Sequence, residues 1–212
     1  MSKAEKFWDR LARTWSSPTE ESEQTDIKVL AKTRPYLEAT DTVLDYGCAK
    51  GSVDLKLAPA VKAIHGIDIS SKMIAAAREA AEARKAANVS FAKTTIFDES
   101  LERESFEVVL AFNIFHLLED APKALLRIGE LLKPGGSLIS VTPCFGEKGT
   151  LPARSAMLLV RAASKIGLIP YVRRWKIGEL QESMDAAGLV TIATEKLVHS
   201  TSEYFVVAKK TP

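Results

Sequence analysis

Two acidic side chains, each at the end of an apolar run, carry the clearest chemistry in this chain of 212 residues. Asp45 precedes a turn that contains Gly47 and Gly51, and Asp68 follows a second apolar run. Glycine lets the backbone approach a ligand closely, because no side chain intervenes. A carboxylate at the end of a second strand can accept both hydroxyls of a ribose. These residues predict a cofactor that contains a nucleoside; the plain alternatives are a tight turn at the glycines and a helix-dipole role for Asp68.

The spacing within the turn indicates which cofactor it suits. The dinucleotide fingerprint Gly-x-Gly-x-x-Gly is absent, and residues 45–51 follow the pattern Asp-x-Gly-x-Ala-x-Gly. This pattern loses the glycine spacing used for a pyrophosphate but keeps an acid before the loop. S-adenosylmethionine has no phosphate and carries an ammonium and a sulfonium, for which Asp45 is an appropriate partner. The turn favours S-adenosylmethionine and leaves a nucleotide-cofactor oxidoreductase as an alternative.

Apolar periodicity supplies the elements that must hold these residues. Strand and helix patterns alternate after residue 41, which predicts a largely parallel sheet with helices on both faces. The last two strands must be antiparallel, because only a few residues join them. Strands are expected at residues 42–45, 63–69, 89–92, 106–112, 137–142, 189–198 and 204–209. Helices are expected at 52–58, 71–87, 121–132, 152–167 and 177–187, with Ser70 and Asp120 as N-caps; helical patterns at 7–15 and 27–37 flank a polar linker at 16–23.

Composition narrows the class of protein. Lys and Arg total 29 against 27 Asp and Glu, and the net charge of +2 is too small to imply a nucleic-acid partner. The 2 cysteines and 3 separated histidines give neither a disulfide framework nor metal-ligand spacing, so no metal site is expected. No apolar stretch reaches the ~18 residues of a membrane span. The first residues, which carry both charges, show no signal-peptide pattern, so a cytoplasmic protein is expected.

Four motifs give the chain a specific resemblance: residues 44–51 (Leu-Asp-Tyr-Gly-Cys-Ala-Lys-Gly), 66–70 (Gly-Ile-Asp-Ile-Ser), 105–109 with 113–118, and 131–138. They resemble class I S-adenosylmethionine-dependent methyltransferases. The opening Phe7-Trp8-Asp9 is similar to the small-molecule branch, where an N-terminal helix folds over the cofactor. The resemblance implies a doubly wound, Rossmann-like α/β sheet of seven strands in the order 3-2-1-4-5-7-6, with an antiparallel last strand. It implies one domain over residues 1–212, divided into a helical cap (1–40), a cofactor-binding core (41–145), a helical insertion or lid (146–178) and a C-terminal helix and hairpin (179–212).

The resemblance assigns the methionine and ribose contacts to one group of residues. Asp45 would hold the methionine ammonium, and Asp68 would bind the ribose. Gly47, Cys48 and Gly51 would frame the methionine moiety. Cys48 is expected to be a small packing residue rather than a nucleophile.

A second group would serve the adenine and the methyl group. Ile69 and Met73 would pack on the adenine, although Met73 could equally be core filler. Thr95 and Ile96 would flank the adenine edge, and Asn113 would approach the methionine. The chain departs from the family pattern at two positions. Ala49 replaces a glycine, which we expect to restrict that backbone to negative φ, and Thr95 replaces an Asp.

The acceptor side offers fewer signals. Methyl transfer needs a general base only if the acceptor arrives protonated. His116 is the residue placed for that role or for another acceptor-side role; a structural histidine in an apolar stretch is the alternative. Tyr171 and Trp175 could line an acceptor pocket or belong to the core.

Residues 148–178 contain seven Lys and Arg and no acid. Arg154, Arg161 and Lys165 fall on one helical face, which is either solvated or part of a lid that draws an anionic acceptor or rests on a membrane surface. The sequence as a whole predicts a methyltransferase that uses S-adenosylmethionine, releases S-adenosylhomocysteine and acts on a small molecule, anionic or lipid-like. A protein that binds the cofactor without catalysis is the other alternative.

Overall fold

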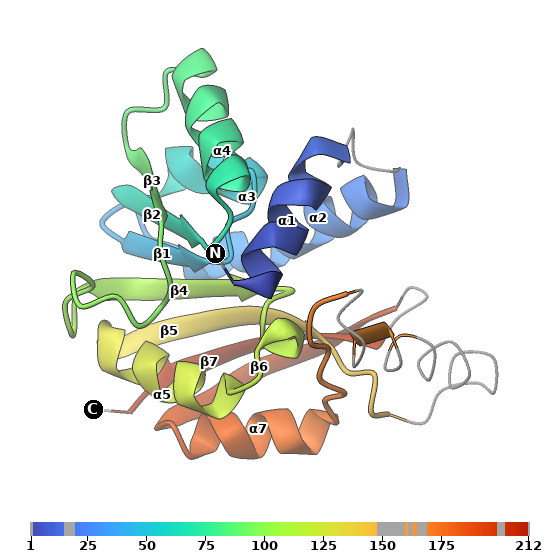
Figure 1. Cartoon of the computed structure of the whole chain (residues 1–212). Helices are drawn as coiled ribbons and strands as arrows, with labels where there is room; N and C mark the ends of the chain where they lie inside the picture. The colour runs from blue at the N-terminus through green and yellow to red at the C-terminus, as the bar shows by residue number, and fades with distance from the viewer. Residues whose placement is uncertain are drawn as a thin grey trace.

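One seven-stranded sheet organises the molecule (Figure 1). The computed structural model describes residues 2–14, 20–147, 160, 163–164, 169–198 and 202–211. The strands are β1 (Thr42–Tyr46), β2 (Ala63–Asp68), β3 (Val89–Lys93), β4 (Phe106–Phe112), β5 (Leu132–Pro143), β6 (Leu189–Val198) and β7 (Ser202–Lys210). The helices are α1 (Lys3–Thr14), α2 (Glu20–Thr33), α3 (Ser52–Leu57), α4 (Ser71–Ala83), α5 (Ala121–Leu131) and α7 (Ile177–Asp185).

The strand order is β3-β2-β1-β4-β5-β7-β6, which confirms the predicted topology. β1 runs parallel to both of its neighbours, with Asp45 beside Gly66 of β2 and Leu110 of β4. β7 is antiparallel to β6, as the short connection between them required, and it is antiparallel to β5 as well. The order reverses between β1 and β4, so the loops that leave these two strands diverge. A crevice at the carboxyl ends of such strands is where doubly wound sheets bind ligands.

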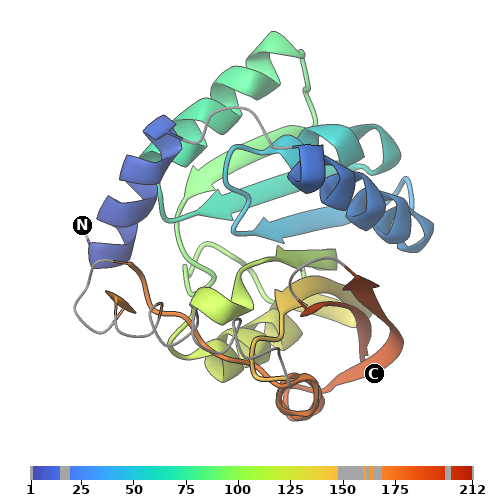
Figure 2. The same cartoon turned by 90° about the vertical axis from the view of Figure 1, so that its right-hand side faces the viewer.

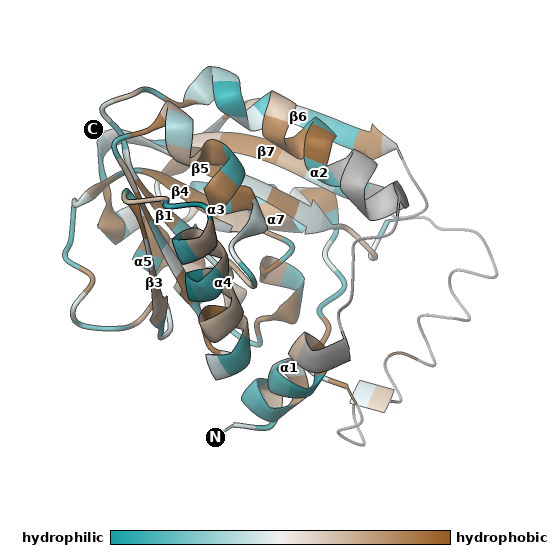
Figure 3. Ribbon diagram, turned by 90° about the horizontal axis from the view of Figure 1, so that it is seen from above, coloured by the Kyte–Doolittle hydropathy of each residue, from teal (hydrophilic) through white to brown (hydrophobic). Residues whose placement is uncertain are grey.

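Alternating residues of β1 bury the two faces of the sheet. Leu44 packs in one cluster with Leu125 of α5 and Met184 of α7, whereas Val43 packs with Val29 of α2 and Leu57 of α3. α4 joins the α3 side in a third cluster with Phe91 of β3 (Figure 2). The hydrophobic colour of Figure 3 follows β5 and β7 through the centre of the molecule. Asp45 lies between Leu44 and Tyr46 and therefore points to the α3 side.

Both predicted N-caps are confirmed. The Ser70 hydroxyl accepts the N–H of Met73 at 3.1 Å, and the Asp120 carboxylate accepts that of Lys123 at 3.3 Å. These bonds satisfy amide groups that a helix start leaves without an intrahelical partner.

Three predicted boundaries were wrong. α4 ends at Ala83 rather than at residue 87, because Lys85 adopts φ 53° and the chain closes with bonds from Lys85 N to Glu82 O and from Ala86 N to Ala81 O. β5 begins at Leu132 rather than at 137, since Leu132 already pairs with Phe106 before a register shift. α2 begins at Glu20, inside the stretch predicted to be a linker.

Part of the predicted insertion lies outside the described residues, as do Trp15 and His199. Within it, Val160, Ala163 and Ser164 are described and are helical. No helix in the described part of the chain is long and apolar enough to cross a membrane.

Candidate functional site: a cavity at the carboxyl ends of β1, β2 and β4

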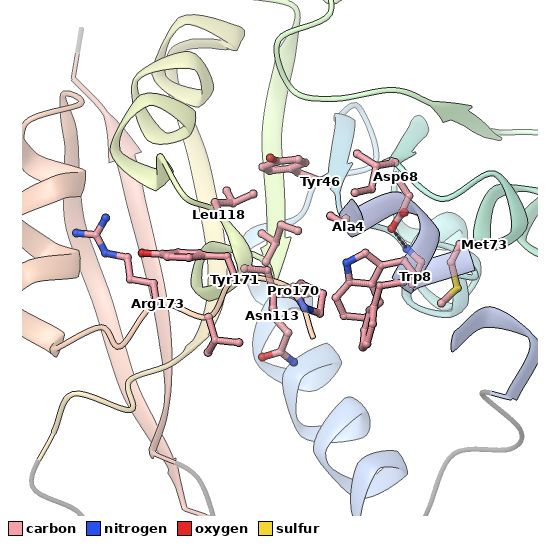
Figure 4. A pocket seen from close by; sticks show the side chains of 18 of the residues that line it. Ala4, Trp8, Tyr46, Asp68, Met73, Asn113, Leu118, Pro170, Tyr171 and Arg173 are labelled. Atoms are coloured by element: carbon pink, nitrogen blue, oxygen red, sulfur yellow. Dashed lines mark hydrogen bonds between the residues drawn. The ribbon is translucent and has the colours of Figure 1, made fainter. Parts of the chain in front are cut away.

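A cavity of about 1010 Å³ opens where the order of the sheet reverses. It takes its walls from the loops after β1, β2 and β4, from α1, and from the extended segment 169–174. Figure 4 shows Trp8, Asp68 and Met73 at one end, and Leu118, Tyr171 and Arg173 at the other. The predicted cofactor residues that line it are Asp45, Gly47, Cys48, Asp68, Ile69, Met73 and Asn113.

The loop after β1 is fixed by its own backbone. The N–H groups of Gly47 and Cys48 both donate to the carbonyl of Ile67, at 2.8 and 3.1 Å. Gly47 adopts φ 85°, in the region that glycine enters without a steric penalty. This conformation turns the loop across the end of β2 and brings backbone to the cavity wall.

Ala49 corrects the sequence analysis. Its φ is 48°, not negative as the missing glycine suggested. Its N–H donates to Asp68 Oδ2 at 3.1 Å. The hydrogen bond and the path of the loop hold a side-chain-bearing residue in the left-handed region, at a cost in backbone strain.

Asp68 supports the loop as well as facing the cavity. Its second oxygen, Oδ1, accepts the N–H of Ser70 at 2.8 Å. Burial raises the pKa of this carboxyl, although the amides of Ser70 and Ala49 act in the opposite direction. Each oxygen keeps a lone pair beyond its amide bond, so the carboxylate can still accept ligand hydroxyls.

Burial raises the pKa of two residues at the carboxyl end of β1, Asp45 and Cys48. Burial, followed by the charge of the neighbouring Asp54, raises the pKa of Asp45 well above its usual range. Burial and the same acidic surroundings raise the pKa of the Cys48 thiol, so this cysteine stays protonated and is a poor nucleophile. The free Cys48 therefore serves as a small wall residue.

Three predicted cofactor residues do not line the cavity. Gly51 adopts φ 71°, and a Cβ there would lie 2.5 Å from Cζ of Phe91, so this glycine permits close packing of the loop on β3. Ile96 is fully buried in the core between the sheet and α5. The hydroxyl of the exposed Thr95 accepts the N–H of Phe97 at 3.3 Å in a local turn. The structure leaves the adenine edge without the contact predicted from this loop.

The resemblance implied that an N-terminal helix folds over the cofactor, and in the structure α1 supplies a wall of the cavity. Phe7 and Trp8 of α1 line the cavity, and their rings meet edge to face with centroids 5.2 Å apart. Met73 also lines it while only 2% exposed, so it is both wall and core.

Asp9 docks α1 onto the first turn of α4. Its carboxylate accepts the Ser70 hydroxyl at 2.6 Å, the Ser71 hydroxyl at 3.1 Å and the N–H of Lys72 at 3.2 Å. Burial works to raise the pKa of Asp9, but these hydrogen bonds outweigh it and hold the pKa below its usual value. A negative charge at a helix N-terminus is favourable, so this contact fixes α1 over the cavity.

The opposite end of the cavity comes from β4 and from segment 169–174. Asn113, at φ 54°, turns the chain out of β4, a conformation that asparagine tolerates better than most residues. Tyr171, 38% exposed, lines the cavity, whereas Trp175 is fully buried and donates its Nε1–H to the carbonyl of Phe115 at 3.1 Å. Of the two aromatic residues singled out from the sequence, one is a wall and the other is core.

Arg173 links segment 169–174 to the turn after β4. Its N–H donates to the His116 carbonyl at 2.7 Å, and its guanidinium lies 3.9 Å from the centre of the Trp175 ring. No acid in the described part of the chain forms an ion pair with Arg173 or Arg174, and both residues line the cavity. The acceptor end therefore contains two cationic side chains without an ion-pair partner among the described residues, and the acidic Glu119 also lines the cavity.

His116 does not line the cavity. Its ring meets Phe145 edge to face at 6.0 Å, and its Nδ1 is buried with no hydrogen-bond partner in the described residues. Burial lowers the pKa of the imidazole to about 4, so it is neutral near pH 7. In the described ranges no group of three or more His, Cys, Asp or Glu side chains is arranged to hold a metal ion.

Together, the sheet order and the position of the cavity define the class of protein: a doubly wound α/β domain of the methyltransferase type. A family model described as a methyltransferase domain matches residues 37–187, and the chain belongs to that family. The match covers the sheet core and its carboxyl-end loops.

Individual relatives cover less of the chain. The chain is 33% identical over 115 residues to aklanonic acid methyltransferase of Streptomyces sp. (strain C5), which is 53% of this chain and 52% of that protein. It is 32% identical over 99 residues to phosphoethanolamine N-methyltransferase 2 of Caenorhabditis elegans, which is 46% of this chain and 23% of that protein. The chain thus aligns with about half the length of the first of these curated relatives.

Solved structures share the fold. The [4+2]-cyclase SpnF superposes with a TM-score of 0.74 at 19% identity, covering 93% of this chain and 85% of that one. At this level of identity the likeness shows the fold alone.

Proposed function

We propose that this protein transfers a methyl group from S-adenosylmethionine to a small-molecule acceptor. One observation carries the proposal. A single cavity joins an acidic end, built by Asp45 and Asp68, to an end that contains Tyr171 and the cationic Arg173. The acidic end suits a cationic nucleoside cofactor, and the family to which the chain belongs supplies the reaction type.

The residues at the acidic end fit this cofactor. Asp45 would face the methionine ammonium and Asp68 the ribose hydroxyls, while backbone at Gly47 and Cys48 lies open to the methionine. Ile69, Met73 and Trp8 would enclose the adenine; this gives Trp8 the role that Thr95 and Ile96 are not placed to fill. When bound, the sulfonium supplies an activated methyl group, so the protein has to orient the acceptor and exclude water.

The acceptor would be an apolar molecule with an anionic group. Ile114, Leu117 and Leu118 provide apolar wall, and Arg173 and Arg174 provide charge beside it. Two relatives are named for an acid and for a phosphate-bearing substrate, which agrees with this chemistry. His116 would position Arg173 through its carbonyl and would not act as the base. Arg154, Arg161 and Lys165 would extend the positive charge, and this part of the proposal lies outside the described residues.

The cavity lies at the upper end of the size range of ligand pockets. Pockets for single drug-sized ligands span about 300–1,000 Å³, and this one is about 1010 Å³. We also propose a cytoplasmic location, with which the free, buried Cys48 and Cys144 agree.

Thermal shift with four ligands tests the cofactor. S-adenosylmethionine and S-adenosylhomocysteine should raise the melting temperature, because they bind only the folded state, and NAD and NADP should not. Stabilisation by a dinucleotide alone would contradict the proposal. Binding of S-adenosylmethionine without turnover of any apolar acid, phosphate or phenol offered as acceptor would instead support a non-catalytic binding protein.

A further inference from the structure

Asp54 is an acidic residue at a buried position, where a negative charge is energetically costly. It lies on α3, is fully buried, and neither of its carboxyl oxygens receives a hydrogen bond from an N–H or O–H donor among the described residues. Its neighbours along the helix, Leu55 and Leu57, are buried in two apolar clusters. A buried carboxylate without donors is strongly disfavoured, so the group needs a proton or a partner that the structure must supply.

The partner is Asp45. Asp45 points to the face of the sheet that α3 covers, and the two carboxyl groups are neighbours, each of which acts on the pKa of the other. Two carboxyl groups can form a hydrogen bond only if one of them carries a proton. Of the two, Asp45 lines the cavity and Asp54 lies behind it.

The charged groups that raise the pKa of the pair from nearby are acidic. Asp68, at the end of β2, adds its charge to that of Asp54 at Asp45, and Asp9 of α1 acts in turn on Asp68. Burial raises the pKa of both members of the pair, that of Asp54 to about 7. Free protein near neutral pH therefore holds the pair mainly in its singly protonated or fully protonated form.

We propose that Asp54 is a second, hidden member of the cation site and that the pair gives up a proton when the cationic end of the cofactor binds. This inference rests on the proposed function, since it takes the methionine ammonium of the cofactor as the cation. An O–H bond of the pair breaks, the proton passes to solvent, and the carboxylate that remains faces the bound cation. Asp54 is a positioning residue, because it acts on the ligand only through Asp45.

The proposal fixes the sign of a pH effect. Because binding releases a proton, affinity must rise with pH until the free pair has lost that proton. With release near pH 7, cofactor affinity should rise about tenfold between pH 6 and pH 8 and then level off. In the free protein the raised pKa also means that stability falls as pH rises from about 4, the usual value for Asp, to about 7.

Calorimetry in paired buffers measures the proton directly. S-adenosylhomocysteine, which keeps the ammonium and is chemically stable, is titrated into the full chain at pH 6.5 in buffers of different ionisation enthalpy. The slope of apparent enthalpy against buffer enthalpy gives the number of protons released. We expect between half a proton and one proton for the wild-type chain.

Asp54→Asn is the decisive variant. Its amide can donate to Asp45 and it removes the charge of Asp54, so Asp45 loses its proton more readily in the free protein. Proton release should fall below the wild-type value, and affinity should rise less between pH 6 and pH 8 than it does in the wild-type chain. Asp41→Asn is the matched control: Asp41 is also buried with a raised pKa, but it precedes β1 at the opposite edge of the sheet. It should leave the proton count at the wild-type value.

Two results would overturn the inference: binding by the wild-type chain with no proton release, or release in Asp54→Asn that equals the wild-type value. If Asp54→Asn does not fold, infrared difference spectroscopy of the wild-type chain decides. The C=O band of a neutral carboxylic acid should weaken when ligand is added, and an unchanged band contradicts the proposal. Failure of the wild-type chain to bind S-adenosylhomocysteine at all would instead count against the proposed function.

Discussion

The two ends of the cavity are built in different ways. The cofactor end consists of the turns that leave β1 and β2, tied together by hydrogen bonds from Gly47, Cys48 and Ala49 to residues 67 and 68. The acceptor end joins the turn after β4 to the extended segment 169–174, more than fifty residues further along the chain, through the bond from Arg173 to His116. One end is acidic and the other basic.

Because of this difference, we expect the first end to bind a widely shared cofactor and the second end to select the acceptor. The acidic end is a short-range structure that suits a cofactor common to many methyltransferases. The basic end depends on a long-range contact and on a stacked pair, Arg173 over Trp175. Damage to one end should therefore spare ligand binding at the other.

The largest effect is expected at Asp68. Asp68→Ala removes a charged acceptor for the ribose and frees the amides of Ala49 and Ser70, so cofactor binding should weaken by roughly 1.5–3 kcal/mol. Titration calorimetry with S-adenosylhomocysteine measures the loss. Asp68→Asn, which keeps one acceptor oxygen, should fall in between, and an unchanged affinity in Asp68→Ala would mean that the ribose binds elsewhere.

Arg173 tests the other end. Arg173→Gln should raise the KM of an anionic acceptor about tenfold, or ~1.4 kcal/mol, the order of one hydrogen bond to a charged group. The dissociation constant of the cofactor should stay at its wild-type value. Lys176→Gln is the control, since Lys176 is nearby and exposed but does not line the cavity. Equal changes in the two variants would show that only overall charge matters.

Asp9 tests whether the wall from α1 belongs to the cofactor end. Asp9→Asn keeps the shape but weakens three hydrogen bonds, so we expect a loss of about 1 kcal/mol and a melting temperature lower by about 2–4 °C. Because the folded pKa of Asp9 is lowered, its contribution is present above the usual Asp value of 3.8 and is lost as pH falls below it. The melting temperatures of the two proteins should thus converge as the pH falls below 3.8; a difference that stays constant as the pH falls further contradicts this role.

The smallest effect is expected at Ala49. Ala49→Gly relieves a left-handed alanine and should stabilise the protein by about 0.5–1 kcal/mol, measured by urea denaturation. Lys85→Gly, at φ 53° beyond α4, is a matched variant away from the cavity and should give a similar gain. Of these two variants, only Ala49→Gly is expected to change cofactor affinity, because the Ala49 amide bonds to Asp68 and the Lys85 amide does not.

Much of the cofactor end was predictable, because each of its signals is local. An acid and a glycine that follow an apolar run fix the end of a strand and its turn, and Asp45, Gly47 and Asp68 all line the cavity as expected. The errors arose at positions whose role or backbone conformation is set by a residue far away in the sequence. Gly51 serves the ring of Phe91, and Ala49 is held at positive φ by Asp68. Asp54 carried one signal that was passed over, an acid between the apolar Val53 and Leu55.

The sequence by itself determined the alternation of strands and helices, the caps of α4 and α5, and the acidic turn, since these depend on periodicity and on residues a few positions apart. The order of the strands was implied by the family resemblance. Only the tertiary structure decided that Asp9 docks α1, that Asp54 meets Asp45, and that Arg173 stacks on Trp175 beside the cavity. The first two contacts join elements whose separation along the chain says nothing about their distance in space, and the third, between residues two positions apart, depends on how their side chains pack. Burial then shifts the pKa of the carboxyl groups, because a carboxyl that is removed from water and placed beside a second carboxyl loses its proton less readily.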